Sequence, residues 1–307
     1  MKVLVSTSSF AKHDSGPLDL LRDNGYEMVF NPYGRTLSPT EVLELAAGCS
    51  GIIAGTEPLG RETLEKLNDL KIISRVGSGI DNVDLGAAAE LGVTVKATPD
   101  GPSQAVAELT LALTLALLRG VAAADSLMRQ GVWQKNMGRL LQGKRVGIIG
   151  LGKIGKRVAL LFKAFGCSIM ASDVNPDTGW AAANGVDLVT LKELLADADI
   201  VTIHVAGGDQ AVIGMQELAE IKPGAFLVNT ARGRLIDEAA LIEALKSGRL
   251  GGAALDVFQV EPYAGELKDL PNVVVTPHIG SYAIESRVEM EAEAVRNLMS
   301  VLEGFRS

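Results

Sequence analysis

A glycine-rich turn at residues 144–155 constrains the fold more than any other stretch of the chain. A short apolar run leads into Gly150, Gly152 and Gly155, and a helical pattern follows. Gly150 permits the turn, Gly152 removes a side chain where a pyrophosphate would approach, and Gly155 lets the helix lie close to the strand. The first turn of the helix adds free N–H groups and a partial positive charge. This stretch predicts a Rossmann strand–turn–helix unit; a glycine turn in another kind of α/β protein is the plainer alternative.

An acidic residue follows the next strand-like run. Residues 168–172 read as a strand and Asp173 comes directly after it. It lies roughly twenty residues beyond the glycine turn, where a dinucleotide's ribose hydroxyls are held. The next residues are Val174, Asn175 and Pro176, so a 2′-phosphate there would meet a carboxylate and no cation. The pattern favours NAD over NADP.

Strand-like and helix-like runs alternate along the rest of the chain, which predicts parallel sheets with helices on both faces. The length of 307 residues suits two domains, and a Pro- and Gly-rich stretch at residues 97–102 marks a boundary. One long helix is expected over residues 103–130, either as a core helix or as one that also packs against a second subunit. Strands are expected at residues 2–6, 27–30, 51–54, 71–75, 93–96, 200–204, 225–229, 252–255 and 273–276, and helices at 39–47, 61–67, 191–196, 237–247 and 281–302.

Charge and cysteine content exclude several classes of function. The formal net charge of -8 argues against nucleic acid as the main partner. Cys49 and Cys167 stand alone, and without a spaced Cys/His cluster we expect neither a disulfide framework nor a metal site. The chain enters a strand at once, without the pattern of a signal peptide, and its most apolar helical run, 109–118, is too short to cross a bilayer. We therefore expect a cytoplasmic protein that does not bind membranes.

A second glycine-containing loop, residues 75–84, follows another expected strand. Gly77, Ser78 and Gly79 expose backbone N–H groups at the carboxyl end of that strand. Such a loop suits a small anion, and ligands of open α/β sheets sit at these strand ends. A plain strand-to-helix turn is an equally good interpretation from the loop alone.

Three charged residues follow successive expected strands in the second half of the chain. Arg232, Glu261 and His278 each come just after such a strand. A guanidinium can bind a carboxylate through two parallel hydrogen bonds. Singly, each residue could be a surface or structural side chain, but together, beside a dinucleotide turn, they predict an active site.

Taken with their surroundings, these residues resemble the D-isomer-specific 2-hydroxyacid dehydrogenase family, and within it the phosphoglycerate dehydrogenase-like branch. The resemblance covers residues 75–84, 105–108, 147–155, 229–233, 251–258, 261–262 and 277–280. It implies two doubly wound parallel-sheet domains with a cleft between them. The first is a discontinuous flavodoxin-like substrate domain, 1–98 plus 281–307, and the second a Rossmann NAD-binding domain, 99–280. It also implies a homodimer packed through the NAD-binding domains.

The same resemblance implies an NAD-dependent oxidoreductase that interconverts a D-2-hydroxy acid and its 2-oxo acid by hydride transfer. His278 would be the general acid in reduction, Glu261 would hold its other ring nitrogen, and Arg232 would bind the substrate carboxylate. Backbone groups of Ser78 and Gly79 would complete the carboxylate site. The positions that would contact NAD are Thr98, Gly150, Gly152, Lys153, Ile154, Gly155, Asp173, Thr230, Ala231, Asp256 and Gly280.

The sequence indicates the identity of the substrate less clearly than it indicates the type of reaction. Arg75 matches an arginine of phosphoglycerate dehydrogenases, and Lys135 and Arg139 lie in a stretch that also resembles theirs. This slightly favours 3-phosphoglycerate and phosphohydroxypyruvate over glyoxylate or hydroxypyruvate. A non-enzymatic NAD-sensing scaffold of the same family is an alternative from another class, and a formate dehydrogenase-like member is disfavoured. One segment departs from the family: residues 205–209 replace a Pro-Leu-Thr turn against the cofactor, which predicts a weaker contact there.

Overall fold

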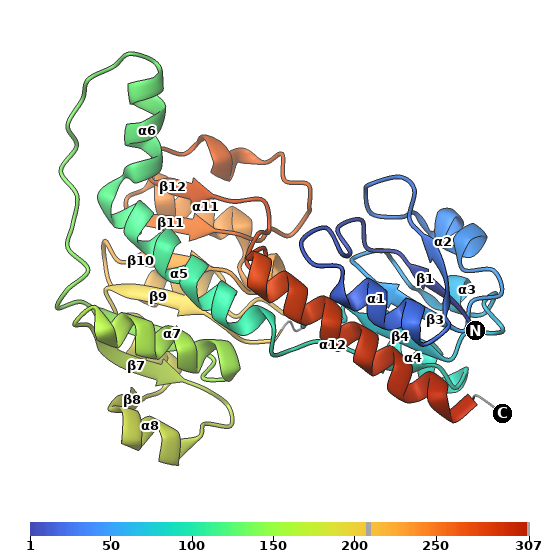
Figure 1. Ribbon diagram of the computed structural model, residues 1–307. Coiled ribbons are helices and arrows are strands. Elements are labelled where there is room, and N and C mark those ends of the chain that lie inside the picture. Colours follow the sequence, from blue (N-terminus) through green and yellow to red (C-terminus); the bar gives the residue numbers. More distant parts are fainter. Residues whose placement is uncertain (207–209, 306–307) are drawn as a thin grey trace. The chain divides into compact units, whose positions relative to one another are not determined.

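The computed structural model describes residues 1–206 and 210–305 and divides the chain into two compact units. Unit 1 is formed by Met1–Pro102 and Ser281–Ser307, and unit 2 by Ser103–Gly280. The first part of unit 1 therefore ends at Pro102, four residues beyond the expected boundary at residue 98. The C-terminal helix returns to unit 1, where it lies beside the strands of the N-terminal part (Figure 1).

Unit 1 contains a five-stranded sheet in which every strand pair is parallel. Its order is β2-β1-β3-β4-β5, the order of flavodoxin-like sheets. Val5 pairs with Ile53, and Ala54 pairs with Arg75, so the carboxyl ends of three neighbouring strands lie side by side. The strands are β1 (Lys2–Val5), β2 (Glu27–Phe30), β3 (Gly51–Ala54), β4 (Ile72–Arg75) and β5 (Thr94–Lys96).

Helices cover both faces of this sheet because each has one apolar side. Met290, Ala294 and Leu298 of the last helix pack with residues of β1, β3 and β4 in one core. Ser38 and Glu41 form a reciprocal capping box that fixes the start of the second helix. The helices are α1 (Gly16–Asp23), α2 (Pro39–Leu45), α3 (Arg61–Leu64), α4 (Leu85–Glu90), α12 (Ile284–Leu302) and the short η3 (Glu303–Phe305).

Unit 2 contains a seven-stranded parallel sheet with the order β12-β11-β10-β9-β6-β7-β8. Counted from β6, six of these strands have the 3-2-1-4-5-6 order of a Rossmann fold, so the expected fold class is confirmed. The order reverses between β6 and β9, where such folds bind their ligands. The strands are β6 (Arg145–Ile149), β7 (Ser168–Ser172), β8 (Val186–Leu188), β9 (Ile200–Ile203), β10 (Phe226–Asn229), β11 (Gly252–Leu255) and β12 (Val273–Val275).

Two hydrophobic cores lie on the two faces of the unit 2 sheet. Leu194 and Leu241 belong to one core, and Leu113 and Phe162 to the other. The helices are α5 (Pro102–Arg119), α6 (Val121–Arg129), α7 (Lys153–Ala164), α8 (Thr178–Asn184), α9 (Leu191–Asp197), α10 (Met215–Glu220), α11 (Glu238–Lys246), η1 (Gly233–Leu235) and η2 (Glu266–Asp269).

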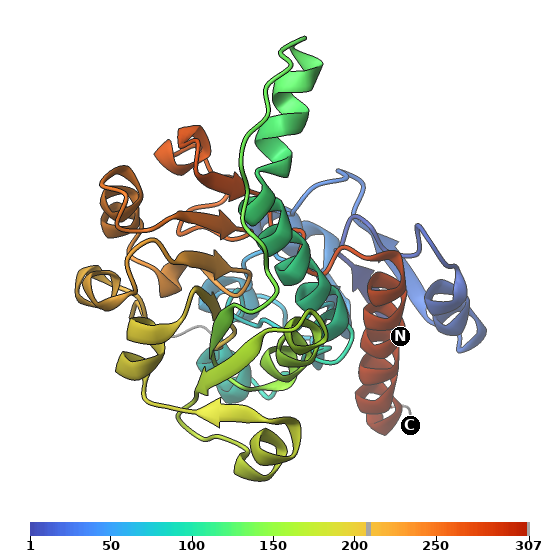
Figure 2. The ribbon, with the colours of Figure 1, turned by 90° about the vertical axis from the view of Figure 1, so that its left-hand side faces the viewer.

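The single helix expected over residues 103–130 was wrong. Gly120 takes a left-handed conformation with φ 61°, and α5 and α6 meet there at an angle of 65°. α6 has no buried residue, and it extends with the segment that follows it beyond the rest of unit 2 (Figure 2). In the described parts of the chain, no single helix is long and apolar enough to cross a membrane, although the bent pair passes that test by length and composition.

Candidate functional site

The glycine turn lies between β6 and α7, at the point where the strand order reverses. Gly150 has φ 93°, a conformation that other residues rarely adopt. A Cβ on Gly155 would lie 2.1 Å from the Gly150 carbonyl oxygen, so α7 can approach the turn only with glycine at this position. The glycines therefore have the structural roles that their spacing predicts.

The residues around this turn fit a dinucleotide. A Cβ on Gly152 would meet no protein atom within 4 Å, and no side chain caps the N-terminus of α7. Lys153 and Ile154 form the first turn of that helix. The carboxylate of Asp173 accepts hydrogen bonds from Leu151 N (2.6 Å) and Asn175 N (2.8 Å). The open space, the free helix start and the adjacent carboxylate are the features that hold a pyrophosphate and a ribose.

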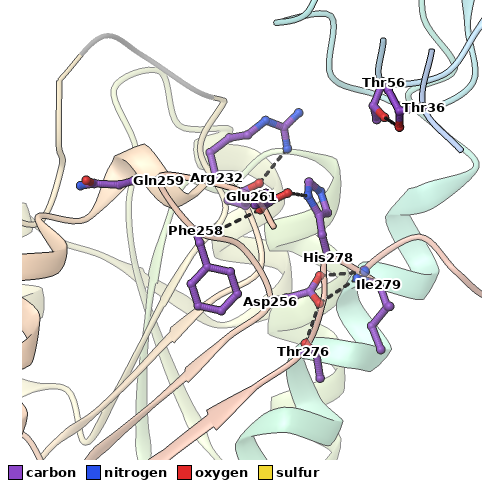
Figure 3. Close-up of polar contacts among 12 residues, drawn as sticks. Thr36, Thr56, Arg232, Asp256, Phe258, Gln259, Glu261, Thr276, His278 and Ile279 are labelled. Atoms are coloured by element: carbon purple, nitrogen blue, oxygen red, sulfur yellow. Dashed lines mark hydrogen bonds and ion pairs between the residues drawn. The ribbon is translucent and has the colours of Figure 1, made fainter. Parts of the chain in front are cut away.

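Arg232, Glu261 and His278 lie together at the carboxyl edge of the unit 2 sheet (Figure 3). His278 Nδ1 is 2.7 Å from Glu261 Oε2, and the two side chains are 47% and 36% exposed. Glu261 Oε1 accepts from Phe258 N at 3.0 Å, which fixes the carboxylate. The Nε2 atom of His278 is therefore the ring nitrogen that can exchange a proton with a ligand.

The loop that carries His278 is held by Asp256. Thr276 Oγ1 (2.6 Å), Ile279 N (2.8 Å) and Gly280 N (2.8 Å) all donate to its buried carboxylate. His278 itself has φ 55°, an uncommon value for a residue with a side chain. Burial raises the pKa of Asp256, although these donors act in the opposite direction. The family resemblance implies a contact between Asp256 and the cofactor, and within the chain the same carboxylate accepts hydrogen bonds from the loop that presents His278.

Arg232 is carried by a similarly braced turn after β10. Asn229 Oδ1 accepts from Ala231 N at 3.0 Å, and Asn229 Nδ2 donates to the Arg232 carbonyl at 2.8 Å. Thr230 is buried, and its hydroxyl pairs with that of Thr110 on α5 at 2.9 Å. The Arg232 guanidinium donates to the Ala231 carbonyl at 2.7 Å. The backbone around Thr230 and Ala231 thus sets the direction of the Arg232 side chain.

In unit 1, the loop after β4 presents Ser78 and Gly79 at the carboxyl edge of the sheet. Ser78 is exposed and Gly79 is half-buried. Thr98 is buried, and its hydroxyl accepts from Gly77 N at 2.7 Å. Arg75 Nη1 donates to the Val76 carbonyl, and the guanidinium lies against Gly77. Within unit 1, Thr98 braces the loop that carries Ser78.

Two buried carboxylates at this edge were missed by the sequence analysis. Glu57 follows β3, and Glu291 lies on α12 beside Arg287. Burial raises the pKa of both carboxyl groups, against opposing contributions from their hydrogen bonds and from Arg75 and Arg287 respectively. The signals available in the sequence were an acid three residues after a strand and an Arg–Glu pair four residues apart on a helix.

The remaining candidate cations lie elsewhere. Arg139 is 5.9 Å from the ring of Phe226, the first residue of β10, and therefore at the opposite end of that strand from Arg232. Lys135 is exposed, and so are Lys12 and His13, two further basic residues of unit 1. The positions of these four residues do not support a phosphate site within either unit.

His204 follows β9 and is a strand-end residue, as expected. Its backbone N–H donates to the Ile149 carbonyl at 2.7 Å, and its Nε2 lies 2.9 Å from Thr202 Oγ1. Burial lowers the pKa of His204 to about 3, so the ring is neutral near pH 7. The unusual turn after it was predicted to weaken a cofactor contact, but residues 207–209 of that turn lie outside the described residues.

No group of metal-binding side chains occurs within residues 1–206 and 210–305. Cys49 and Cys167 are buried and not joined to each other. What the described residues do bring together is an acid–base pair at one sheet edge and a dinucleotide turn in the same unit.

Comparison with known proteins agrees with this geometry. Residues 111–280 match the model of the D-isomer specific 2-hydroxyacid dehydrogenase family, NAD binding domain. A D-3-phosphoglycerate dehydrogenase of Methanocaldococcus jannaschii is 40% identical over 276 residues, which is 87% of this chain and 52% of that protein. A glyoxylate reductase of Thermococcus litoralis is 38% identical, over 81% of this chain and 79% of that protein. The chain thus spans about half the length of the phosphoglycerate dehydrogenases that it matches.

A solved structure matches the fold over nearly the whole chain. The TT0316 protein from Thermus thermophilus superposes with a TM-score of 0.91 and 38% identity, covering 99% of this chain and 97% of that one. NAD(H) is the cofactor that the family model names, and the glycine turn with Asp173 fits it. The chain belongs to the D-isomer specific 2-hydroxyacid dehydrogenase family.

Proposed function

We propose that this protein is an NAD-dependent oxidoreductase that interconverts a D-2-hydroxy acid and its 2-oxo acid. The observation that carries the proposal is the 2.7 Å pair between Glu261 and His278, with Arg232 beside it at the carboxyl edge of a Rossmann sheet. NAD(H), when bound, supplies or accepts the hydride. A proton donor and a carboxylate-binding cation are what the protein must add.

Each of these residues has a defined task in the proposal. Glu261 holds Nδ1 of His278, so that Nε2 gives a proton to the 2-oxo oxygen in reduction and takes it back in oxidation. Arg232 binds the substrate carboxylate and stabilises charge that develops on the neighbouring oxygen. We assign further hydrogen bonds to that carboxylate to the backbone N–H groups of Ser78 and Gly79.

The relatives suggest two kinds of substrate. Some are D-3-phosphoglycerate dehydrogenases and another is a glyoxylate reductase. The proposal therefore covers 3-phosphoglycerate with phosphohydroxypyruvate, and the alternative of glyoxylate or hydroxypyruvate. Arg75 supports the phosphorylated pair only if its charge is available to the substrate.

Oxidation of NADH against a panel of 2-oxo acids tests the activity. We expect turnover of at least one acid, and we expect His278→Ala to abolish it while NADH binding, followed by fluorescence, persists. Bound NADH with no turnover of phosphohydroxypyruvate, hydroxypyruvate, glyoxylate or pyruvate would favour the NAD-sensing scaffold instead.

A cytoplasmic homodimer completes the proposal. Trp133, Met137 and Leu140 are exposed on the segment that follows α6. Large apolar side chains gathered on one projecting segment are typical of a protein–protein interface. The resemblance to family members that pair through this domain supports a second copy of the chain as the partner.

A further inference from the structure

Two arginines at the carboxyl edge of unit 1 are each accompanied by a buried carboxylate. Arg75 ends β4, and Glu57 follows the neighbouring strand β3. Arg287 Nε is 3.0 Å from Glu291 Oε1 on α12, and Arg287 Nη2 donates to Thr7 Oγ1 after β1. Glu57 is 1% exposed and Glu291 2% exposed. A carboxylate of the same unit therefore offsets part of the positive charge that each arginine could offer to a ligand.

Glu57 occupies the centre of the edge. The hydroxyl of Ser6, the residue after β1, donates to Glu57 Oε1, and Gly55 N lies 3.2 and 3.1 Å from the two carboxylate oxygens. Asn82 Nδ2 donates to the Glu57 carbonyl at 2.7 Å and so ties the loop after β4 to this residue. Ser6 and Gly55 are the kind of donors that would otherwise cradle an anion at strand ends. The protein's own carboxylate uses them.

Arg75 lies close enough to Glu57 for their charges to interact. Ala54, three residues before Glu57, is the cross-strand partner of Arg75, and Val76 N donates to the Ala54 carbonyl at 2.9 Å. The positive charge of Arg75 lowers the pKa of Glu57, against the larger effect of burial. When Glu57 is ionised, its buried negative charge beside Arg75 reduces the attraction of that arginine for a second anion.

We propose that Glu57 is a specificity-determining residue that excludes phosphorylated substrates, so that the protein acts on an unphosphorylated 2-oxo acid with a single negative charge. This inference rests on the proposed function and names its substrate class. The single carboxylate would be held at Ser78 and Gly79, on the same edge as Glu57. A phosphate would bring further negative charge toward Glu57 and Glu291, and it needs unopposed cations. Lys12 and His13 are exposed, so solvent weakens their attraction for a phosphate, and the charge of His13 also acts on Glu291.

The ratio of kcat/KM for phosphohydroxypyruvate to that for hydroxypyruvate tests the proposal on one preparation, so that the active fraction cancels. We expect the wild-type protein to favour hydroxypyruvate at least about tenfold. Glu57→Gln keeps the shape and an acceptor for Gly55 N, and removes the charge. We expect it to raise the ratio by on the order of tenfold, mainly through a lower KM for the phosphorylated acid.

Glu44→Gln is the matched control, because Glu44 is exposed on α2 and the substitution removes the same charge from unit 1. We expect its ratio to equal that of the wild type. A wild-type preference for phosphohydroxypyruvate, or an unchanged ratio in Glu57→Gln, would overturn the role of Glu57 while the proposed oxidoreductase activity stands. If Glu57→Gln does not fold, the wild-type ratio alone decides. Absence of turnover with every acid would instead refute the proposed function, and this inference with it.

Discussion

At the scale of single residues, the orientation of His278 depends on one carboxylate. Glu261 Oε2 is 2.7 Å from Nδ1, and Glu261 Oε1 is held by Phe258 N. Glu261→Gln can keep one of these bonds, but an amide that donates to Nδ1 leaves the wrong tautomer for proton transfer through Nε2. We expect kcat for a 2-oxo acid to fall about 10²-fold, with NADH affinity unchanged. Glu243→Gln, on an exposed position of α11, is the control; equal activity in both variants would refute the pairing.

The buried side chain of His204 should make the stability of the folded protein depend on pH. Its pKa is about 3 in the folded chain and 6.5 ordinarily, because burial disfavours the charged ring. Between these values the unfolded chain binds a proton that the folded chain does not, so stability is full above pH 6.5 and falls as the pH drops below it. At a pH of about 5.5 this loss amounts to about 1 kcal/mol. Urea unfolding at about pH 7.5 and about pH 5.5 measures it.

His204→Gln removes the titrating ring and retains a group that can pair with Thr202 Oγ1. We expect its free energy of unfolding to change less between the two pH values than that of the wild type. His13→Gln serves as the control, since His13 is exposed. An equal pH slope in wild type and His204→Gln would show that the ring is not held neutral by burial.

At the scale of elements, the loop from Thr276 to Gly280 has its conformation imposed by Asp256. Asp256→Asn places an amide opposite two backbone N–H groups and one hydroxyl, so that at least one donor loses its acceptor. We expect kcat to fall at least about tenfold as His278 loses its position. Thr276→Val removes only one of the three hydrogen bonds, so we expect it to lower kcat less than Asp256→Asn does. A larger loss in Thr276→Val than in Asp256→Asn would contradict this order.

Substitutions at two glycines of the turn should distinguish an effect on folding from an effect on cofactor binding. A Cβ on Gly155 would collide with the Gly150 carbonyl oxygen at 2.1 Å, whereas a Cβ on Gly152 would meet no protein atom within 4 Å. We therefore expect Gly155→Ala to lower the free energy of unfolding by about 1–3 kcal/mol. Gly152→Ala should leave stability nearly unchanged but weaken NADH binding, measured by fluorescence titration. Wild-type NADH affinity in Gly152→Ala would show that the pyrophosphate does not approach there.

How much the sequence could predict depended on the range of the interactions involved. The turn at Gly150 and the strand-end positions of Arg232, Glu261 and His278 follow from local patterns. Gly150 follows β6, and the three charged residues lie at the carboxyl edge of the same parallel sheet. The bend at Gly120 was missed, because the apolar pattern continues across a residue whose left-handed conformation breaks the helix. The hydrogen bonds that Asp256 makes and the whole role of Glu57 were missed because their partners come from other strands and loops. Such partners are known only once the sheet order is known.

At the scale of the whole molecule, the proposed second copy of the chain would cover the projecting segment after α6. Trp133, Met137 and Leu140 are 78%, 100% and 70% exposed, and leaving such side chains in water is unfavourable. We expect light scattering to give twice the mass of one chain, and Met137→Glu with Leu140→Glu to shift the protein toward the monomer, since an unpaired charge in an apolar interface is costly. Met215→Glu, at a position 75% exposed on α10, should leave the mass unchanged. A dimer that survives both substitutions in the segment would place the interface elsewhere. A monomeric wild-type protein would refute the proposal that a second copy of the chain covers these exposed side chains.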